Sequence, residues 1–185
     1  MSFINTIKNT FGAYFLRQDM KGLTRDRGML SLEDSKTIGI LFDAGDKEEF
    51  ELVKKYVIYL RELKKKVKVV GFFSKGTSAD FTYSKLEYDF FTQKETTWYN
   101  KPSNKFVNNF IAEEFDILID LNIHDHFPLR YTAGTSRARF KVGRKKEGDE
   151  CIYDLMIEGT EGKGLKYFLR QADTYLQMLR KPESA

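Results

Sequence analysis

The stretch "LNIHDHF", residues 121–127, contains both histidines of the 185-residue chain, with one aspartate between them. Imidazole binds metal ions and transfers protons near neutral pH, so the spacing suggests a metal site or a general acid–base site. In an extended segment, residues two apart point to the same side, which would let His124 and His126 act together. A third interpretation needs no chemistry, because Asn122 and Asp125 are turn formers at the end of a strand. The pattern by itself therefore assigns no catalytic residue and no metal ligand.

A run of basic residues is the second feature with chemical potential. From His126 to Lys146 the chain has no acidic residue, yet its whole net charge is only +4, so charge is segregated along the sequence. The run contains seven cations: Arg130, Arg137, Arg139, Lys141, Arg144, Lys145 and Lys146. Arg137, Arg139 and Lys141 alternate with apolar residues, which on a strand would place all three on one face.

This basic run predicts a surface that binds phosphate or carboxylate oxygens. The predicted anion-binding residues are Arg130, Arg137, Arg139, Lys141 and Arg144, and Lys21, Arg25 and Arg27 are expected to extend them. Its partners would be RNA, a ribonucleoprotein or another acidic protein. The alternative is a solvated face that is neutralised by nearby acids such as Glu147, Asp149 and Glu150.

Short apolar runs alternate with amphipathic segments along the chain, and these elements must position the polar residues. Apolar runs predict strands over 36–45, 67–73, 87–93, 115–122, 138–143 and 152–159. Helical spacing predicts helices over 3–16, 46–66, 104–114 and 128–133, and a last one beginning near 164. The alternation predicts a three-layer, Rossmann-like α/β sandwich with a mainly parallel sheet of about six strands, an N-terminal amphipathic helix and a C-terminal helix.

Polar residues mark where two of these helices begin. Asp46 and Glu49 have the spacing of a capping box at the start of the 46–66 helix. Ser103 is the predicted cap of the 104–114 helix, whose buried face would consist of Phe106, Val107 and Phe110.

The domain organisation follows from composition. We expect an N-terminal helix and basic connector over 1–30, one α/β domain over 31–181 and a loose tail over 182–185. The single cysteine, Cys151, excludes an intramolecular disulfide and fits a reducing compartment. No apolar run is long enough to span a membrane, and the first residues do not have the pattern of a signal peptide, so we expect a cytoplasmic protein.

A ligand site in such a sheet is expected where the strand order reverses, beyond the carboxyl ends of the strands. If the first and fourth strands are neighbours, this crevice is lined by Asp43, Asn122, His124 and Asp125. The turn after the first strand, "DAGDKEE", has one glycine and several acids, whereas a dinucleotide fingerprint has three glycines beside the pyrophosphate. The sequence therefore predicts no cofactor.

Two resemblances add to this interpretation. The segments "FDILIDLN" and "FPLRYTAGTSRARFKVG" loosely resemble the N-terminal half of heptosyltransferase-type glycosyltransferases of the GT-B fold, over about 30 residues. Over most of its length, through "ILFDAG", "FDILIDLN", "YTAGTSRARFKVG" and "YDLMIE", the chain resembles a family of uncharacterised small α/β proteins found mainly in Bacteroidetes. The second resemblance implies the fold and a bacterial cytoplasmic setting, and neither implies catalytic residues.

Three functional hypotheses follow. The leading one is a non-enzymatic binding protein that uses its basic surface. The alternative is a small enzyme, or a relic of one, that holds a nucleotide or sugar phosphate in the switch-point crevice. The third is a scaffold whose N-terminal helix docks on a partner through Phe3, Ile7 and Phe11.

Overall fold

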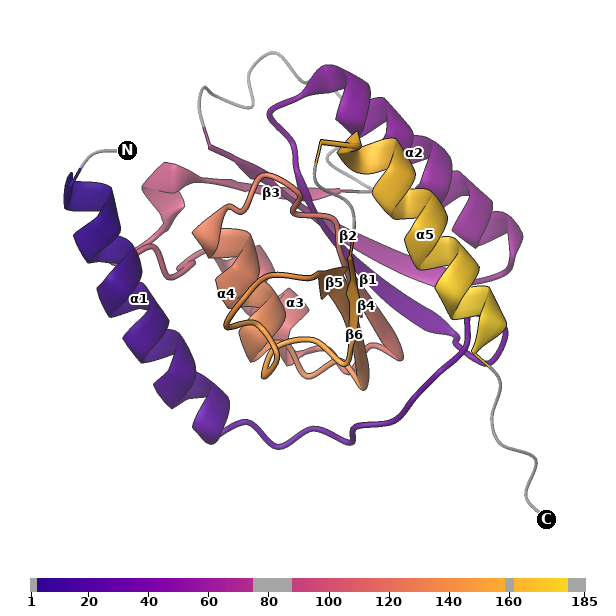
Figure 1. The fold of residues 1–185 in the computed structure, drawn as a ribbon, viewed down its shortest axis with the longest axis horizontal. Helices are drawn as coiled ribbons and strands as arrows, with labels where there is room; N and C mark the ends of the chain where they lie inside the picture. The colour runs from indigo at the N-terminus through magenta and orange to yellow at the C-terminus, as the bar shows by residue number, and fades with distance from the viewer. Residues whose placement is uncertain (1–2, 75–87, 159–161, 180–185) are drawn as a thin grey trace.

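The computed structural model describes residues 3–74, 88–158 and 162–179, with side chains from residue 7 on, and these form a layered α/β fold (Figure 1). The strands are β1 (Thr37–Asp43), β2 (Lys66–Phe73), β3 (Asp89–Thr92), β4 (Ile117–Asp120), β5 (Phe140–Arg144) and β6 (Leu155–Ile157). The helices are α1 (Phe3–Lys21), α2 (Lys47–Glu62), α3 (Lys105–Ala112), α4 (Phe127–Thr135) and α5 (Gly164–Met178). The predicted order of strands and helices is confirmed. The predicted tail over 182–185 lies outside the described residues.

The six strands within the described residues form one sheet in the order β3-β2-β1-β4-β5-β6, and every neighbouring pair is parallel. The chain first moves from β1 outward to β3 and then returns to the other side of β1 to add β4, β5 and β6. The predicted Rossmann-like sheet is confirmed, and its switch point lies between β1 and β4.

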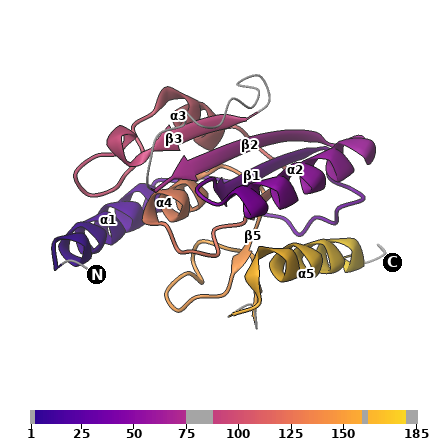
Figure 2. The same cartoon turned by 90° about the horizontal axis from the view of Figure 1, so that it is seen from above.

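Helices cover both faces of the sheet, as Figures 1 and 2 show. On one face, Ile38, Ile40 and Phe42 of β1 pack in a core with α2 and α5. On the other face, Leu41 packs in a second core with α3 and α4. Side chains therefore alternate between two buried layers, which explains why the strands are continuous apolar runs.

The start of α3 differs from the prediction. The side chain of Asn104, rather than Ser103, caps the helix and accepts a hydrogen bond from the N–H of Phe106 at 2.7 Å. Val107 and Phe110 are buried as predicted, but Phe106 is 54% exposed, so its predicted burial is wrong. The capping box of α2 is half right, because Asp46 accepts from the N–H of Glu49 at 2.9 Å while the Glu49 carboxylate contacts His124.

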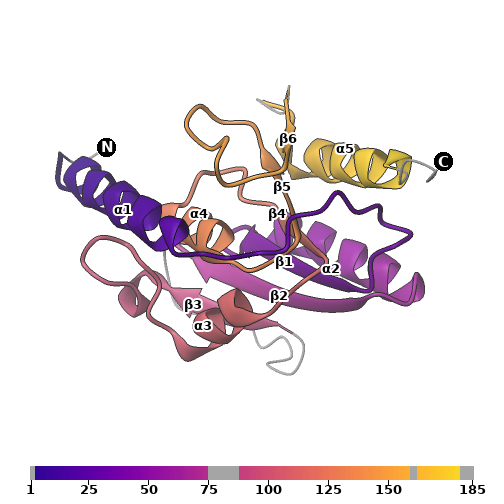
Figure 3. The ribbon, with the colours of Figure 1, turned by 90° about the horizontal axis from the view of Figure 1, so that it is seen from below.

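The N-terminal helix forms an additional layer outside α4. α1 runs five residues beyond its predicted end, and its Leu16 lies in the core shared with α4. Its other face leaves Ile7, Phe11 and Tyr14 exposed, and docking of a partner on this helix stays a prediction. The connector after α1 then crosses to the opposite face, where Leu32 packs against α5 (Figure 3). Within the described ranges, no helix is both long and apolar enough to cross a membrane.

Gly39 in β1 tests the packing of the α3 face. A Cβ at this position would lie 2.9 Å from ring atoms of both Phe110 and Phe115, which are buried. We expect Gly39→Ala to lower the free energy of unfolding by about 1–3 kcal/mol, because the rings must shift. Gly28→Ala is the control, since its Cβ would meet only Arg139 Nη2 at 3.9 Å. Urea unfolding of both variants measures the difference in the free energy of unfolding. Equal effects would contradict the close packing of Phe110 and Phe115 against Gly39.

Candidate anion-binding site around Lys141

The predicted position of Lys141 on an anion-binding surface with Arg137 and Arg139 is wrong, because the side chain is buried. In the sheet, Lys141 pairs with Leu118 of β4 and is only 1% exposed. Its Nζ donates hydrogen bonds to the carbonyl oxygens of Ala133 at 2.7 Å and Gly134 at 3.0 Å, in the last turn of α4. The prediction failed because helices cover both faces of the sheet, so alternation along β5 leads from one buried layer to the other.

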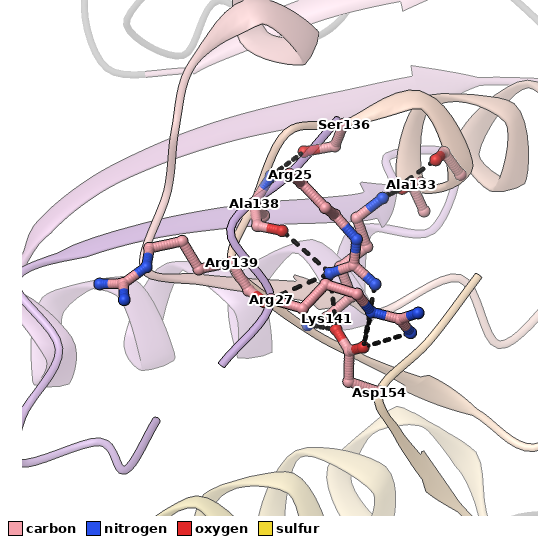
Figure 4. Close-up of polar contacts among 9 residues, drawn as sticks. Arg25, Arg27, Ala133, Ser136, Ala138, Arg139, Lys141 and Asp154 are labelled. Atoms are coloured by element: carbon pink, nitrogen blue, oxygen red, sulfur yellow. Dashed lines mark hydrogen bonds and ion pairs between the residues drawn. The ribbon is translucent and has the colours of Figure 1, made fainter. Parts of the chain in front are cut away.

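Two arginines of the connector lie beside this lysine and share one carboxylate, that of Asp154 (Figure 4). Arg25 donates to both oxygens of Asp154 at 2.7 and 2.9 Å, and also to the carbonyl of Ala138 at 3.0 Å. Arg27 donates to Asp154 Oδ1 from two nitrogens, at 2.7 and 3.0 Å. The backbone N–H of Lys141 donates to Asp154 as well, at 2.9 Å. Asp154 therefore holds the connector, β5 and the start of β6 together.

The charges at this site are unbalanced. Asp154 supplies one negative charge to two arginines, and no described carboxylate forms an ion pair with the Lys141 amine. Burial acts to raise the pKa of Asp154, but the hydrogen bonds from Arg25 and Arg27 outweigh it and the pKa is lowered. Burial, and next the positive charge of Arg25, lower the pKa of Lys141 to about 7. The uncharged amine is therefore far more accessible at neutral pH than at the ordinary pKa of a lysine.

A cavity of about 320 Å³ opens beside these groups. Its lining residues are Met20, Leu23, Thr24, Arg25, Arg27, Gly134, Lys141 and Cys151. Three of them are basic and none is acidic. A cavity of this volume lies at the lower end of the range for small-molecule sites. The sequence predicted that Arg25 and Arg27 of the connector extend an anion-binding surface. It did not predict the role of Asp154, because this residue lies 129 positions from Arg25.

The other predicted anion-binding residues do not join Lys141 on one surface. Carboxylates of the chain form ion pairs with four of the seven cations: Arg130 with Asp149, Arg139 with Asp26 and Asp116, Lys145 with Glu158 and Lys146 with Asp125. Within the described ranges, Arg137 and Arg144 form no ion pair. Arg139 precedes β5 and Arg144 ends it, so about 16 Å of strand separates them.

At the switch point, the structure brings Asp43 and Asn122 together as expected, but with a different histidine. His126 Nε2 lies 2.8 Å from Asp43 Oδ2, and the side chain of Asn122 bonds to both the N–H and the carbonyl of His126, at 2.8 and 2.9 Å. His124 instead lies 3.0 Å from Glu49, and Asp125 pairs with Lys146. Burial acts to raise the pKa of Asp43, but hydrogen bonds from His126 and Gly45 lower it overall.

The carboxylate of Asp120 is buried next to Asn122, and no sequence pattern predicted a role for it. Asp120 accepts a hydrogen bond from the Tyr153 hydroxyl at 2.5 Å and another from the N–H of Asn122 at 3.0 Å. Burial raises the pKa of Asp120 to about 6. The polar cavity that Asp120, Asn122 and Tyr153 line has a volume of about 10 Å³, which is room for a water molecule. In the described part of the chain, no three His, Cys, Asp or Glu side chains form a metal-ligand group.

Fold and cavity together define a three-layer α/β protein with a Rossmann-type sheet and a basic cavity under its N-terminal connector. A family model matches residues 8–179, and the chain belongs to that family, the family of unknown function DUF6913. No curated protein and no solved structure matches the chain. The expected membership of a family of unknown function is confirmed, whereas the glycosyltransferase resemblance and the bacterial source stay predictions.

The hydrogen bonds of Asn122 give a prediction for the switch point. Asn122→Ala removes both side-chain bonds to His126 and leaves a partly buried N–H and carbonyl without these partners. We expect the free energy of unfolding to fall by about 1–3 kcal/mol. Asn109→Ala, on the exposed face of α3, is the matched control and should change it by less than about 0.5 kcal/mol. Urea unfolding decides, and a loss no larger than that of the control would refute the structural role of Asn122.

The buried amine gives a prediction for pH. The folded pKa of Lys141, about 7, lies below its ordinary value of 10.5, so between these values the unfolded chain binds more protons. Stability from this group is therefore lowest below pH 7 and rises with pH across that window. The free energy of unfolding of the wild type, minus that of Lys141→Met, should increase by up to about 1.4 kcal/mol per pH unit. Urea unfolding at pH values from 6 to about 9 measures this, and a flat difference would show that Lys141 stays protonated.

Proposed function

We propose that the protein binds a small anionic ligand in the cavity beside Lys141. The observation that supports this most directly is the lining of the cavity, which contains Arg25, Arg27 and Lys141 and no carboxylate. A phosphate or carboxylate group would supply the negative charge that Asp154 alone does not provide. Charge-assisted hydrogen bonds from guanidinium and amine groups to such oxygens are among the strongest polar contacts in proteins.

Arg25 and Arg27 would have different roles in ligand binding. Arg25 is 7% exposed and is fixed by Asp154 and by backbone carbonyls, so it contributes charge rather than a free donor. Arg27 is 57% exposed and, among the described residues, is bound only to Asp154, so its guanidinium would have N–H groups left for a ligand. Met20 and Leu23 add an apolar part to the lining. The ligand class is therefore a compact phosphorylated or carboxylated molecule with a short apolar part.

This proposal narrows the predicted binding function from a basic surface to a cavity. A surface for RNA or an acidic protein gains support only from Arg137 and Arg144, because carboxylates neutralise four of the other cations and Lys141 is buried. An enzyme site at the switch point gains support from the contact between Asp43 and His126. The polar cavity next to that contact has room for a water molecule only, so it favours a ligand less than the basic cavity does.

Binding of inorganic phosphate and of a panel of small phosphorylated and carboxylated compounds tests the proposal. We expect calorimetry to detect binding to the wild type and Arg27→Ala to weaken it about 10- to 100-fold, through loss of a charge-assisted contact. Arg137→Ala is the matched control. Arg137 is exposed, does not line the cavity and forms no ion pair within the described ranges.

The two variants also distinguish the cavity from a basic surface. A short single-stranded RNA should bind weakly and without dependence on Arg27. If instead RNA binds with a steep salt dependence, and Arg137→Ala weakens it as much as Arg27→Ala does, the basic surface is the functional one and the cavity proposal fails.

A further inference from the structure

The hydrogen bonds of the Lys141 amine match its uncharged form. A neutral amine has two N–H groups, and the carbonyl oxygens of Ala133 and Gly134 accept both of them, at 2.7 and 3.0 Å. An ammonium group has a third N–H, for which no acceptor is present among the described residues. The two carbonyls thus leave the nitrogen lone pair unused.

The two positive groups that face Lys141 disfavour its protonation as well, whereas the charge of Asp154 favours it. Arg25 and Arg27 approach from the connector, and both are positive. Asp154, the nearest acid, already accepts five hydrogen bonds: two from Arg25, two from Arg27 and one from the backbone of Lys141. Cys151 also lines the cavity. The lowered pKa of Lys141 agrees with this arrangement.

We infer that Lys141 is a carbonyl-reactive amine, and that the ligand class of the cavity is an aldehyde or ketone with an anionic group. This inference rests on the proposed anion binding, because Arg27 would hold the phosphate or carboxylate while the carbonyl faces the amine. An unprotonated lysine in a desolvated site next to other cations is the form that attacks carbonyl carbons. Lys141 and Gly134, whose carbonyl accepts a hydrogen bond from Nζ, both line the cavity.

The reaction balances without any further reagent. The lone pair of Nζ forms a bond to the carbonyl carbon, and the electron pair of the C=O π bond moves to oxygen. One proton moves from nitrogen to oxygen, which gives a carbinolamine. The C–O bond then breaks, the oxygen leaves as water with the second amine proton, and a C=N bond to Lys141 remains.

A purely structural role is the competing interpretation, because Lys141 also satisfies carbonyls at the C-terminal end of α4. Such a role predicts an inert amine. Because reagents reach a buried amine less easily, an exposed lysine would then be labelled faster than Lys141. The two interpretations therefore differ in the site selectivity of carbonyl labelling and not only in stability.

Trapping with glyoxylate, which combines an aldehyde with a carboxylate, tests the inference. Wild-type protein is treated at pH 7 with glyoxylate and cyanoborohydride, and peptide mass spectrometry follows the reduced adduct at each lysine. We expect Lys141 to be labelled at least about tenfold faster than the exposed Lys105, since far more of its amine is unprotonated. Inorganic phosphate should slow labelling at Lys141 and leave Lys105 unchanged. Lys141→Arg should lose the adduct at this site only.

The controls separate this inference from the proposed function. Acetaldehyde has no anionic group, so Arg27→Ala should slow labelling by glyoxylate more than labelling by acetaldehyde, which reports only the change in the reactivity of the amine. If phosphate binds in an Arg27-dependent manner while Lys141 is labelled no faster than Lys105, the reactive amine is refuted and anion binding stands. If phosphate neither binds nor protects, the proposed function is refuted, and recognition of an anionic carbonyl compound falls with it.

Discussion

Burial of both faces of the parallel sheet is the constraint on which the rest of the structure depends. Because helices cover each face, every side chain in the middle of a strand must fit an apolar layer or find polar partners inside it. β5 meets this condition in two ways. Phe140 and Val142 pack in the core with α2 and α5, whereas Lys141 enters the opposite core and extends to the last turn of α4. The unpaired carbonyls of a helix end are suitable acceptors for a buried amine.

The same constraint explains the position of Asp154. The connector must pass from the α1 layer to the opposite face of the sheet, and Arg25 anchors it by hydrogen bonds to the carbonyls of Ala138 and Arg139. A buried guanidinium needs a carboxylate, and Asp154 provides it at the start of β6. Because Asp154 is already occupied by Arg25 and Arg27, it does not neutralise Lys141. The lowered pKa of Lys141 is thus a consequence of its burial and of how the connector is attached.

The sequence was sufficient to predict the fold because its signals are local. Apolar runs of strand length and amphipathic segments predicted the strands and helices, and their alternation predicted the parallel sheet and the switch point between β1 and β4. The site was less accessible, because its contacts join distant residues. Arg25 and Asp154 are 129 positions apart, and Asp43 and His126 are 83 apart. The choice between His124 and His126 depended on Asn122, which fixes the backbone of His126 and turns its ring toward β1.

In this Rossmann-type sheet, the proposed anion-binding cavity does not lie at the switch point. There, Tyr153 packs over Gly143, where a Cβ would lie 2.5 Å from its ring, and its hydroxyl reaches Asp120. Side chains of the domain itself therefore occupy space that a ligand takes in other sheets of this topology. α1 contributes Met20 to the lining of the basic cavity, and the connector contributes Leu23, Thr24, Arg25 and Arg27. These segments lie within the residues that the family model matches.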